Sequence, residues 1–363
     1  MDIAPRRVGR WIVEPFLHVE PEHLYNPLTD RILAAGDPGY VELRRLLEGG
    51  GVAETVGVRQ PSLVNQGWLI EEVDDLAARF HLKYVALEAN TSCNQECYFC
   101  PVSVEARHTH VMPMEFYEEI VRQLAAYRDT LEGVSMVQYN EPTLDPRFLD
   151  RVRVLKEHGL RPAVLTNGSG LTPARVDAIL NMGGLRFLSV NLSTLDAGRY
   201  ARDRGADHLK VVLRHLDYLK TRRLAPEMVI AVLGTGDETH RRDHREIAER
   251  FAGSCFEVRY YEVMNRAGNV PLGLRPPVPR QQLCGCEQTG SRPLQWIHIT
   301  PHGTCVLCCQ DYQEQYVVGD LREQTVKQVL AGPAIARLRR WAYGLDEAPA
   351  DFICRHCVYA RTR

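Results

Sequence analysis

The chain has 363 residues, of which 45% are hydrophobic, enough for one large domain with appendages or for two to three smaller domains. Its formal net charge of −2 argues against binding to nucleic acid or to a membrane surface. No apolar run reaches the roughly 18–20 residues that a membrane span needs. The first residues lack the apolar segment of a secretory signal, so we expect a cytoplasmic protein whose grouped cysteines bind metal.

Residues 1–80 are expected to form a small N-terminal α/β appendage. Leu43, Leu46 and Leu47 predict a short helix, and the stretch from Leu63 to Leu69 resembles the end of a winged-helix module. Because no cluster of catalytic side chains occurs there, we interpret this segment as a module for packing or for substrate docking.

Residues 81–265 alternate strand and helix patterns, which predicts a parallel α/β sheet. The predicted strands are 83–90, 134–139, 162–166, 186–193, 228–234 and 256–263. The predicted helices are 113–128, 146–158, 172–182, 197–222 (in two pieces, broken near Gly205) and 241–251. The sheet is either open and doubly wound or curved into a partial barrel, and in both cases the site lies at the C-terminal ends of the strands.

Three cysteines, Cys93, Cys97 and Cys100, follow the first predicted strand. Three thiolates on one tight loop can hold three irons of a [4Fe–4S] cube and leave the fourth iron open to a non-protein ligand. A structural zinc site would want four ligands, usually as two separated pairs. A disulfide framework is disfavoured because the total of eleven cysteines is odd. We therefore predict an iron–sulfur cluster at this loop.

Polar side chains also occur at the ends of the next three strands. Glu141, within Asn140-Glu141-Pro142, comes after the second strand and Asn167 after the third, and Ser193 lies at the end of the fourth. Since the C-terminal ends of parallel strands meet at one edge of a sheet, these groups are expected around one mouth together with the cysteine loop.

Weaker catalytic candidates lie on or next to the sixth strand. Cys255 stands apart from both cysteine groups, but a lone cysteine is more often an inert buried residue, and the start of a strand is the wrong end of the sheet. Arg259 and Tyr261 share one face of this strand, where paired or solvated roles are the alternative. A predicted solvated or salt-bridged helix face carries Arg199, Arg202, Arg204 and Arg214.

Residues 266–363 begin with a segment rich in Pro, Gly and Arg and continue with seven cysteines. The apolar stretches around His302-Gly303 predict a β-hairpin, and a helix is expected over 326–343. Two ligands from the hairpin region and a distant Cys-x-x-Cys complete a four-thiolate site for either zinc or an iron–sulfur cluster. The predicted ligands are Cys286, Cys308, Cys354 and Cys357. Further candidates are Cys284, Cys305 and Cys309, of which Cys305 is the strongest rival for the hairpin position.

Together these patterns resemble the radical S-adenosylmethionine (SAM) superfamily, because the first loop is Cys-x3-Cys-x2-Cys with an aromatic residue before its third cysteine. The run from His302-Gly303 to Cys308-Cys309-Gln310-Asp311, the later Gly319-Asp320-Leu321 and the final Cys-x-x-Cys resemble the SPASM or twitch extensions of that superfamily. The resemblance covers about residues 83–357. It implies a partial (β/α)6 barrel at 81–265, after the appendage at 1–80, and a SPASM/twitch module at 266–363 with one or two auxiliary iron–sulfur clusters.

The resemblance also implies roles for the predicted site residues. Cys93, Cys97 and Cys100 would ligate the first cluster, SAM would chelate its open iron, and Phe99 would lie near the adenine.

Glu141 would hold the methionine ammonium, as a carboxylate facing a cation should. Both glycines of the family's Gly-Gly-Glu-Pro motif are replaced here, by Tyr139 and Asn140. Asn167 and Ser193 would contact the ribose or the carboxylate of SAM, with capping of their strand ends as the alternative.

Members of this superfamily cleave SAM reductively, with an electron from a donor such as flavodoxin or ferredoxin, to a radical that abstracts hydrogen from a substrate C–H bond. We rank first the oxidation of a small polar molecule, such as an aminocyclitol or aminoglycoside, because an auxiliary cluster is suited to accept the second electron. The alternatives are a maturase that oxidises or crosslinks a ribosomally made peptide and an epimerase that uses Cys255. A non-catalytic iron–sulfur protein is least favoured.

Overall fold

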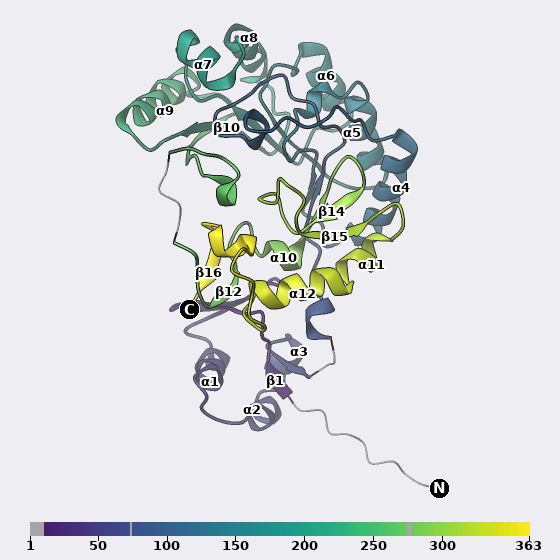
Figure 1. Cartoon of the computed structure of the whole chain (residues 1–363), viewed down its shortest axis with the longest axis vertical. Coiled ribbons are helices and arrows are strands. Elements are labelled where there is room, and N and C mark those ends of the chain that lie inside the picture. The colour runs from purple at the N-terminus through teal and green to yellow at the C-terminus, as the bar shows by residue number, and fades with distance from the viewer. Residues whose placement is uncertain (1–10, 73–74, 274–277) are drawn as a thin grey trace. The chain divides into compact units, whose positions relative to one another are not determined.

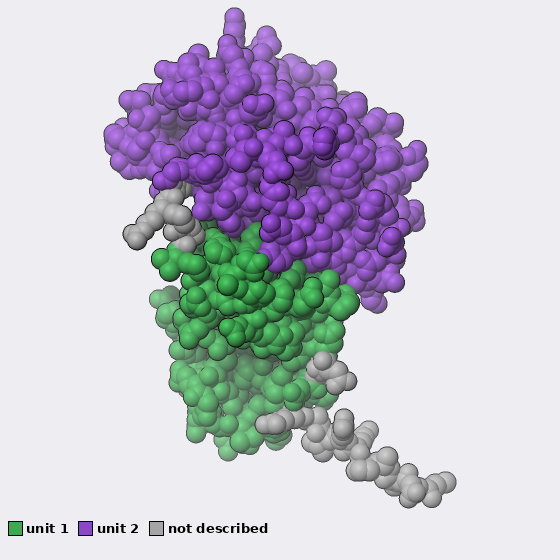
Figure 2. Space-filling view, viewed as in Figure 1, with its two compact units in different colours: residues 1–81, 278–295, 330–363 green, residues 82–277, 296–329 purple. Residues whose placement is uncertain are grey.

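A computed structural model describes residues 11–72, 75–273 and 278–363. The chain divides into two compact units: unit 1 comprises residues 1–81, 278–295 and 330–363, and unit 2 comprises residues 82–277 and 296–329 (Figure 2). Among the described residues, none of the helices combines the length and the apolar composition that a membrane crossing requires.

Unit 2 is built on a nine-stranded sheet in the order β11-β10-β9-β8-β7-β6-β13-β14-β15. The six strands from β6 to β11 are all parallel, as the sequence predicts, and β13 lies parallel to β6 on its other side. The parallel strands are β6 (Tyr84–Leu87), β7 (Gly133–Ser135), β8 (Pro162–Thr166), β9 (Phe187–Asn191), β10 (Glu227–Gly234), β11 (Glu257–Glu262) and β13 (Trp296–Ile299). The antiparallel strands are β14 (Thr304–Val306) and β15 (Val317–Asp320), so the hairpin predicted around His302-Gly303 is confirmed.

Helices α4 to α9 form an arc along the outer side of these parallel strands (Figure 1). The helices of unit 2 are α4 (Met114–Leu124), α5 (Phe148–Glu157), α6 (Pro173–Asn181), α7 (Ala197–Arg204), α8 (Leu209–Leu219), α9 (Glu238–Arg250) and α11 (Val326–Leu330), whose last residue belongs to unit 1. Most of them bury an apolar stripe, although α7 and α9 also bury polar side chains. In α4 the stripe comprises Tyr117, Ile120, Val121 and Leu124, at the spacing of a helix face.

The ends of the predicted elements differ from the structure by up to four residues, and one predicted helix is split. Strand β7 ends at Ser135 instead of continuing to Tyr139, because the chain turns where the Gln138 amide donates to Asn140 Oδ1 at 3.3 Å. The predicted helix over 326–343 is split into α11 and α12 (Pro333–Ala342), since Pro333 has no N–H for a helix interior. The predicted break near Gly205 is confirmed, and Gly205 has the left-handed φ of 64°.

The N-terminal part of unit 1 has a hydrophobic core of its own. Its helices are α1 (Pro38–Leu47), α2 (Ala53–Arg59) and α3 (Pro61–Asn65), and its strands are β1 (Trp11–Val13), β2 (His18–Val19), β3 (His23–Asn26), β4 (Arg31–Ala34) and β5 (Leu69–Glu71). Strands β2, β3 and β4 form an antiparallel sheet, and β1 pairs with β5. The core consists of Leu17, Leu24, Tyr40, Leu43, Val56, Leu63, Trp68 and Leu69.

The C-terminal part of unit 1 contains β12 (Leu283–Cys286), α10 (Arg292–Gln295), α12 and β16 (Ala360–Thr362), with β12 antiparallel to β16. Within this unit Arg339 of α12 is fully buried and donates hydrogen bonds to the carbonyl oxygens of Ala77 and Pro293. Distant segments of the chain therefore pack into unit 1. The domain boundaries at residues 80 and 265 stay a prediction.

Candidate active site

The loop with Cys93, Cys97 and Cys100 follows the C-terminal end of β6, and its backbone is attached to the end of α7. The amide of Glu96 donates to the carbonyl oxygen of Arg204 at 2.8 Å, and that of Tyr98 donates to the carbonyl oxygen of Asp203 at 3.1 Å. These two bonds flank Cys97, which is buried, whereas Cys93 and Cys100 are partly exposed. Burial raises the pKa of Cys93 to about 12. The loop thus presents three thiols from one fixed backbone.

Phe99 lies in an apolar cluster between the loop and the ends of the far strands. It is 7% exposed and packs with Cys97 and Val263, with the partly buried Leu233 and Leu272 beside them. Leu233 belongs to β10 and Val263 follows β11, which are the strands of the parallel sheet farthest from β6. The Phe99 ring therefore connects the cysteine loop to the C-terminal ends of these distant strands.

Glu141 is a buried carboxylate, 2% exposed, at the end of the loop after β7. Its Oε1 accepts hydrogen bonds from the Thr143 amide, the Thr143 hydroxyl and the Thr166 hydroxyl, at 3.1, 2.5 and 2.7 Å. Its Oε2 accepts from the Asn167 amide at 2.7 Å. Burial raises the pKa of Glu141, and these donors act in the opposite direction by stabilising the ionised form.

Asn167 joins the loop after β8 to the cysteine loop. Its side-chain amide donates to Asn94 Oδ1 at 2.8 Å, and Asn94 in turn donates to Ser169 Oγ at 3.0 Å. The structure therefore brings Asn167 and Glu141 together with the cysteine loop at one edge of the sheet, where sequence reasoning placed them.

Ser193 is paired with a residue that was not predicted from the sequence to belong to the site. Its Oγ accepts a hydrogen bond from Arg204 Nη2 at 2.6 Å, and Arg204 Nη1 lies 3.6 Å from Cys97 Sγ. Arg204 was expected on a solvated or salt-bridged helix face, but its side chain is only 1% exposed. The expectation was wrong for this arginine because the cysteine loop covers the last turn of α7. It was right for Arg199, whose guanidinium binds both oxygens of Asp243 at 2.6 Å.

Tyr139, which stands where the superfamily motif has glycine, fills space between the two cysteine regions of unit 2. Its hydroxyl donates to the carbonyl oxygen of Cys309, and its ring packs edge-on against Tyr312 at 4.8 Å. The guanidinium of Arg107 lies over both rings and binds both oxygens of the buried Glu88 at 2.7 Å.

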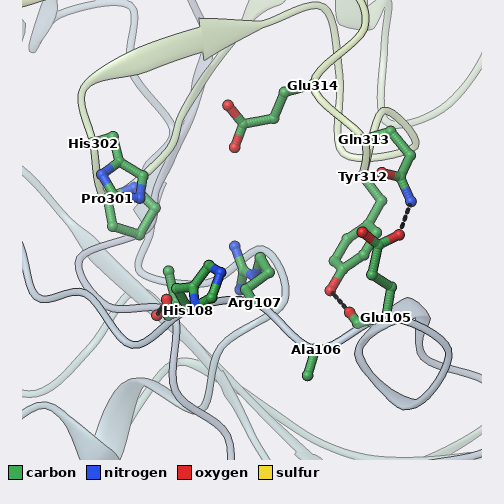
Figure 3. Close-up of a pocket in the computed structure, with 10 residues that line it drawn as sticks. Glu105, Ala106, Arg107, His108, Pro301, His302, Tyr312, Gln313 and Glu314 are labelled. Carbon is green, nitrogen blue, oxygen red and sulfur yellow. Dashed lines mark hydrogen bonds between the residues drawn. The ribbon is translucent and has the colours of Figure 1, made fainter.

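A polar pocket of about 390 Å³ lies beside this cluster (Figure 3). Glu314 directs its carboxylate into the pocket, and Arg107, His108 and His302 face it from the other walls. Burial raises the pKa of Glu314. Arg107 is already neutralised by Glu88, and Glu105 accepts a hydrogen bond from the Gln313 side-chain amide at 2.8 Å. The pocket therefore offers the carboxylate of Glu314 and two imidazoles to a ligand.

The weaker candidates lie elsewhere. The amide of Cys255 bonds to the Lys220 carbonyl before β11 begins, at the opposite ends of the strands from the cysteine loop. Arg259 pairs with Glu227 at 2.8 Å and with Glu257 at 2.6 Å, and Tyr261 is 43% exposed. The structure therefore does not bring these three residues to the mouth.

The predicted auxiliary ligands are divided between the two units. Cys286, Cys354 and Cys357 lie in unit 1, and Cys308 lies in unit 2, so their assignment to one site stays a prediction. Of the further candidates, Cys284 is partly exposed on β12, Cys305 is fully buried on β14 and Cys309 is partly exposed. In the part of the chain that the structure covers, no three His, Cys, Asp or Glu side chains are grouped closely enough to hold a metal ion.

Comparison with known proteins identifies the class of this site. The family model for the radical SAM superfamily matches residues 87–250, and the SPASM model, an iron-sulfur cluster-binding domain, matches residues 286–358. The chain belongs to the radical SAM superfamily and has a C-terminal SPASM iron–sulfur domain. It is therefore a radical SAM enzyme. Its cofactors are a [4Fe–4S] cluster, SAM and one or more auxiliary iron–sulfur clusters in the SPASM domain.

A relative in Niallia circulans, the S-adenosyl-L-methionine-dependent 2-deoxy-scyllo-inosamine dehydrogenase, is 31% identical over 279 residues, which are 75% of this chain and 91% of that protein. Among solved structures, Streptococcus suis SuiB bound to precursor peptide SuiA aligns with a TM-score of 0.56 and 10% identity, over 91% of this chain and 89% of that chain. The structure of anSMEcpe with bound AdoMet aligns with a TM-score of 0.52 and 13% identity, over 76% and 83% of the two chains. The two structural likenesses show the fold, an α/β radical SAM partial barrel.

The residues at the mouth of unit 2 fit these cofactors. Three thiols lie on one loop, a buried carboxylate lies at Glu141 and an apolar cluster surrounds Phe99. In addition, Arg204 Nε is buried and has no hydrogen-bond partner among the residues that the structure describes, so the positive charge of this guanidinium remains to be balanced at the mouth.

Proposed function

We propose that this enzyme dehydrogenates a small polyhydroxylated amine of the aminocyclitol or aminoglycoside class. The observation that carries the proposal is the 31% identity to the 2-deoxy-scyllo-inosamine dehydrogenase over 91% of that protein. When bound, SAM and the clusters supply the radical and the redox equivalents for hydrogen abstraction from the substrate. We also infer a cytoplasmic location from the use of grouped cysteines as ligands.

In this proposal each part of the mouth has its own task. Cys93, Cys97 and Cys100 hold the first cluster, and Glu141 binds the methionine ammonium of SAM through a charge-assisted hydrogen bond. Phe99 packs beside the adenine, and its apolar neighbours exclude water. Asn167 and Ser193 orient the remaining polar groups of SAM. Cys286, Cys308, Cys354 and Cys357 are the proposed ligands of an auxiliary cluster.

The pocket of Figure 3 has the groups that an amino polyol requires. We assign Glu314 to the substrate ammonium, because no ion pair inside the described part of the chain occupies its carboxylate. His108 and His302 can each donate to or accept from a hydroxyl. A secondary alcohol of the substrate would lose one hydrogen atom to the radical. The resulting substrate radical would then lose one electron, for which an auxiliary cluster is the proposed acceptor, and one proton to solvent, to give a ketone.

The test is an anaerobic reaction of the reconstituted enzyme with SAM, a reductant and 2-deoxy-scyllo-inosamine. We expect a ketone that is lighter by two hydrogen atoms, and transfer of deuterium from the labelled carbinol carbon to 5′-deoxyadenosine. If SAM is cleaved but neither this amine nor a panel of related aminocyclitols is oxidised, the substrate class is wrong while the enzyme class stands.

The matched variant Glu314→Gln should raise KM for the amine and leave substrate-free SAM cleavage unchanged.

A second candidate, the peptide maturase, is favoured by a specific feature of unit 1. Strand β4 is the edge of the sheet β2-β3-β4, and no other described strand pairs with it. Its Ile32 is 66% exposed, and an open strand edge can accept an extended peptide as an added strand. Because residues 1–80 are more than a fifth of the chain, the SuiB alignment over 91% of it includes part of this segment.

The two candidates predict different substrates for the same cofactors. For the maturase, a synthetic peptide encoded by a short reading frame next to this gene should bind to the full-length protein and leave the reaction with fewer hydrogen atoms. Ile32→Pro, which prevents strand pairing at this edge, should abolish binding of such a peptide but not oxidation of an aminocyclitol.

A further inference from the structure

Arg204 is a buried cation that has no carboxylate partner in the described part of the chain. Arg151 is equally buried but is held by Asp145 at 2.5 Å, whereas no acidic group among the described residues comes within ion-pair distance of Arg204. Its guanidinium instead meets the Ser193 hydroxyl, the Cys97 thiol at 3.6 Å and the face of the Phe99 ring at 5.0 Å. Burial of a charge next to neutral groups alone costs free energy, so this position is suited to a negative neighbour.

The position of Arg204 relative to Cys97 is fixed by the backbone. The amides on both sides of Cys97 donate to the last two carbonyl groups of α7, as described above. Gly205 then ends the helix in the left-handed region, and a Cβ at this position would lie 3.0 Å from Glu96 Cβ. The guanidinium and the sulfur are therefore held side by side by the polypeptide itself.

We propose that Arg204 is a positioning residue for the first cluster: its Nη1 donates a hydrogen bond to Cys97 Sγ when this sulfur is a cluster ligand, and thereby makes the cluster easier to reduce. The proposal rests on Cys97 being a ligand, but it does not depend on the substrate. Hydrogen bonds to cluster sulfurs and positive charge nearby stabilise the reduced, more negative form, which raises the reduction potential. Reduction is the step that SAM cleavage requires.

The test compares the reconstituted holoenzyme with Arg204→Met and, as a matched control on the same helix, Arg202→Met. Arg202 is a surface cation, with its side chain 70% exposed. The reduction potential of the first cluster is measured in the absence of SAM, by redox titration with electron paramagnetic resonance detection. The signal of this cluster is identified in a separate sample as the one that changes when SAM is added. We expect Arg204→Met to lower the ratio of reduced to oxidised cluster about tenfold at a fixed potential, a shift of 59 mV for one electron, and Arg202→Met to leave it unchanged.

The proposal is overturned if Arg204→Met with full iron content titrates like the wild type, or if Arg202→Met shifts the potential equally. If Arg204→Met does not retain its iron, Arg204→Lys decides. This variant keeps the charge but lacks the planar donor pair, so it should hold iron and titrate below the wild type. A lysine variant with the wild-type potential, or one that also loses its iron, would assign Arg204 a packing role instead.

Discussion

At the scale of single residues, Glu141 has the most complete set of hydrogen bonds at the mouth of unit 2. Four donors from two strand-end loops converge on its two oxygens, although the carboxylate is almost fully buried. This arrangement keeps one carboxylate in a fixed orientation. A cation that binds there would find the negative charge already positioned.

Replacing Glu141 with Gln should therefore weaken SAM binding about ten- to hundredfold, because a hydrogen bond to a charged group contributes about 1.5–3 kcal/mol. The measurement is an anaerobic titration of the reconstituted protein with SAM. Glu132→Gln is the control, since Glu132 makes only surface ion pairs in the same unit. An unchanged affinity for Glu141→Gln, or an equal loss for Glu132→Gln, contradicts the assigned role.

The sequence located Glu141 because Asn-Glu-Pro follows a predicted strand at the position of a known motif. Arg204 was not recognised, since an arginine among several on one helix is typical of a solvated face. Its burial depends on a loop that lies about a hundred residues away in the chain, and only the tertiary fold reveals this. Similarly, the sequence shows that Tyr139 replaces a glycine of the motif, but it does not predict the hydrogen bond from the Tyr139 hydroxyl to the Cys309 carbonyl.

At the scale of elements, the end of α7 supports the cysteine loop through Gly205. Gly205→Ala should destabilise the protein, because a left-handed conformation costs about 1–2 kcal/mol for a residue with a Cβ, and should also loosen the first cluster. Gly253→Ala is a matched control: Gly253 has a similar φ of 72°, but nothing lies within 4 Å of its added Cβ. Denaturant unfolding should detect a loss of stability in both variants. Iron analysis should detect a loss of iron in Gly205→Ala alone. Equal iron retention in both variants would show that the contact with Glu96 is unimportant.

In unit 1, strand β2 carries a buried histidine that should make stability depend on pH. His18 lies 3.1 Å from the Tyr343 hydroxyl, and burial, assisted by the charge of Arg361, lowers its pKa to about 3. Between about pH 6.5 and 3 the unfolded chain binds a proton that the folded chain excludes. This contribution to stability is complete above pH 6.5 and falls with decreasing pH by up to about 1.4 kcal/mol per unit. Unfolding measured from pH 7 to 4 should show this slope, and His18→Gln should reduce it. An identical slope in the variant would rule out His18 as its source.

The longer elements were predictable, and the shortest were not. Periodicity located α4 to α9 and the six parallel strands because most of them bury an apolar stripe or run, although β11 has no fully buried residue. The sheet β2-β3-β4 was missed, since its strands have only two to four residues and carry little pattern. The break between α11 and α12 was visible in principle, because Gly332-Pro333 interrupts the apolar periodicity.

At the scale of the whole molecule, the two cysteine groups should hold separate clusters. We expect about eight irons per chain if the SPASM domain binds one cube, and about twelve if it binds two. Cys354→Ser together with Cys357→Ser should remove about four irons and abolish substrate oxidation, while the first cluster still cleaves SAM. Iron analysis and quantification of 5′-deoxyadenosine test this separation. A double variant that keeps all its iron would exclude these cysteines as ligands.

We propose that the loop of Cys93, Cys97 and Cys100 holds a cluster that cleaves SAM. The most direct measurement is the amount of 5′-deoxyadenosine that the anaerobically reconstituted and reduced protein forms from SAM, compared with a Cys97→Ala variant. We predict that the wild type forms 5′-deoxyadenosine and methionine and that the variant, although folded, forms none. If the fully iron-loaded, reduced wild type releases no 5′-deoxyadenosine, or if the Cys97→Ala variant forms as much as the wild type, this loop does not hold a cluster that cleaves SAM.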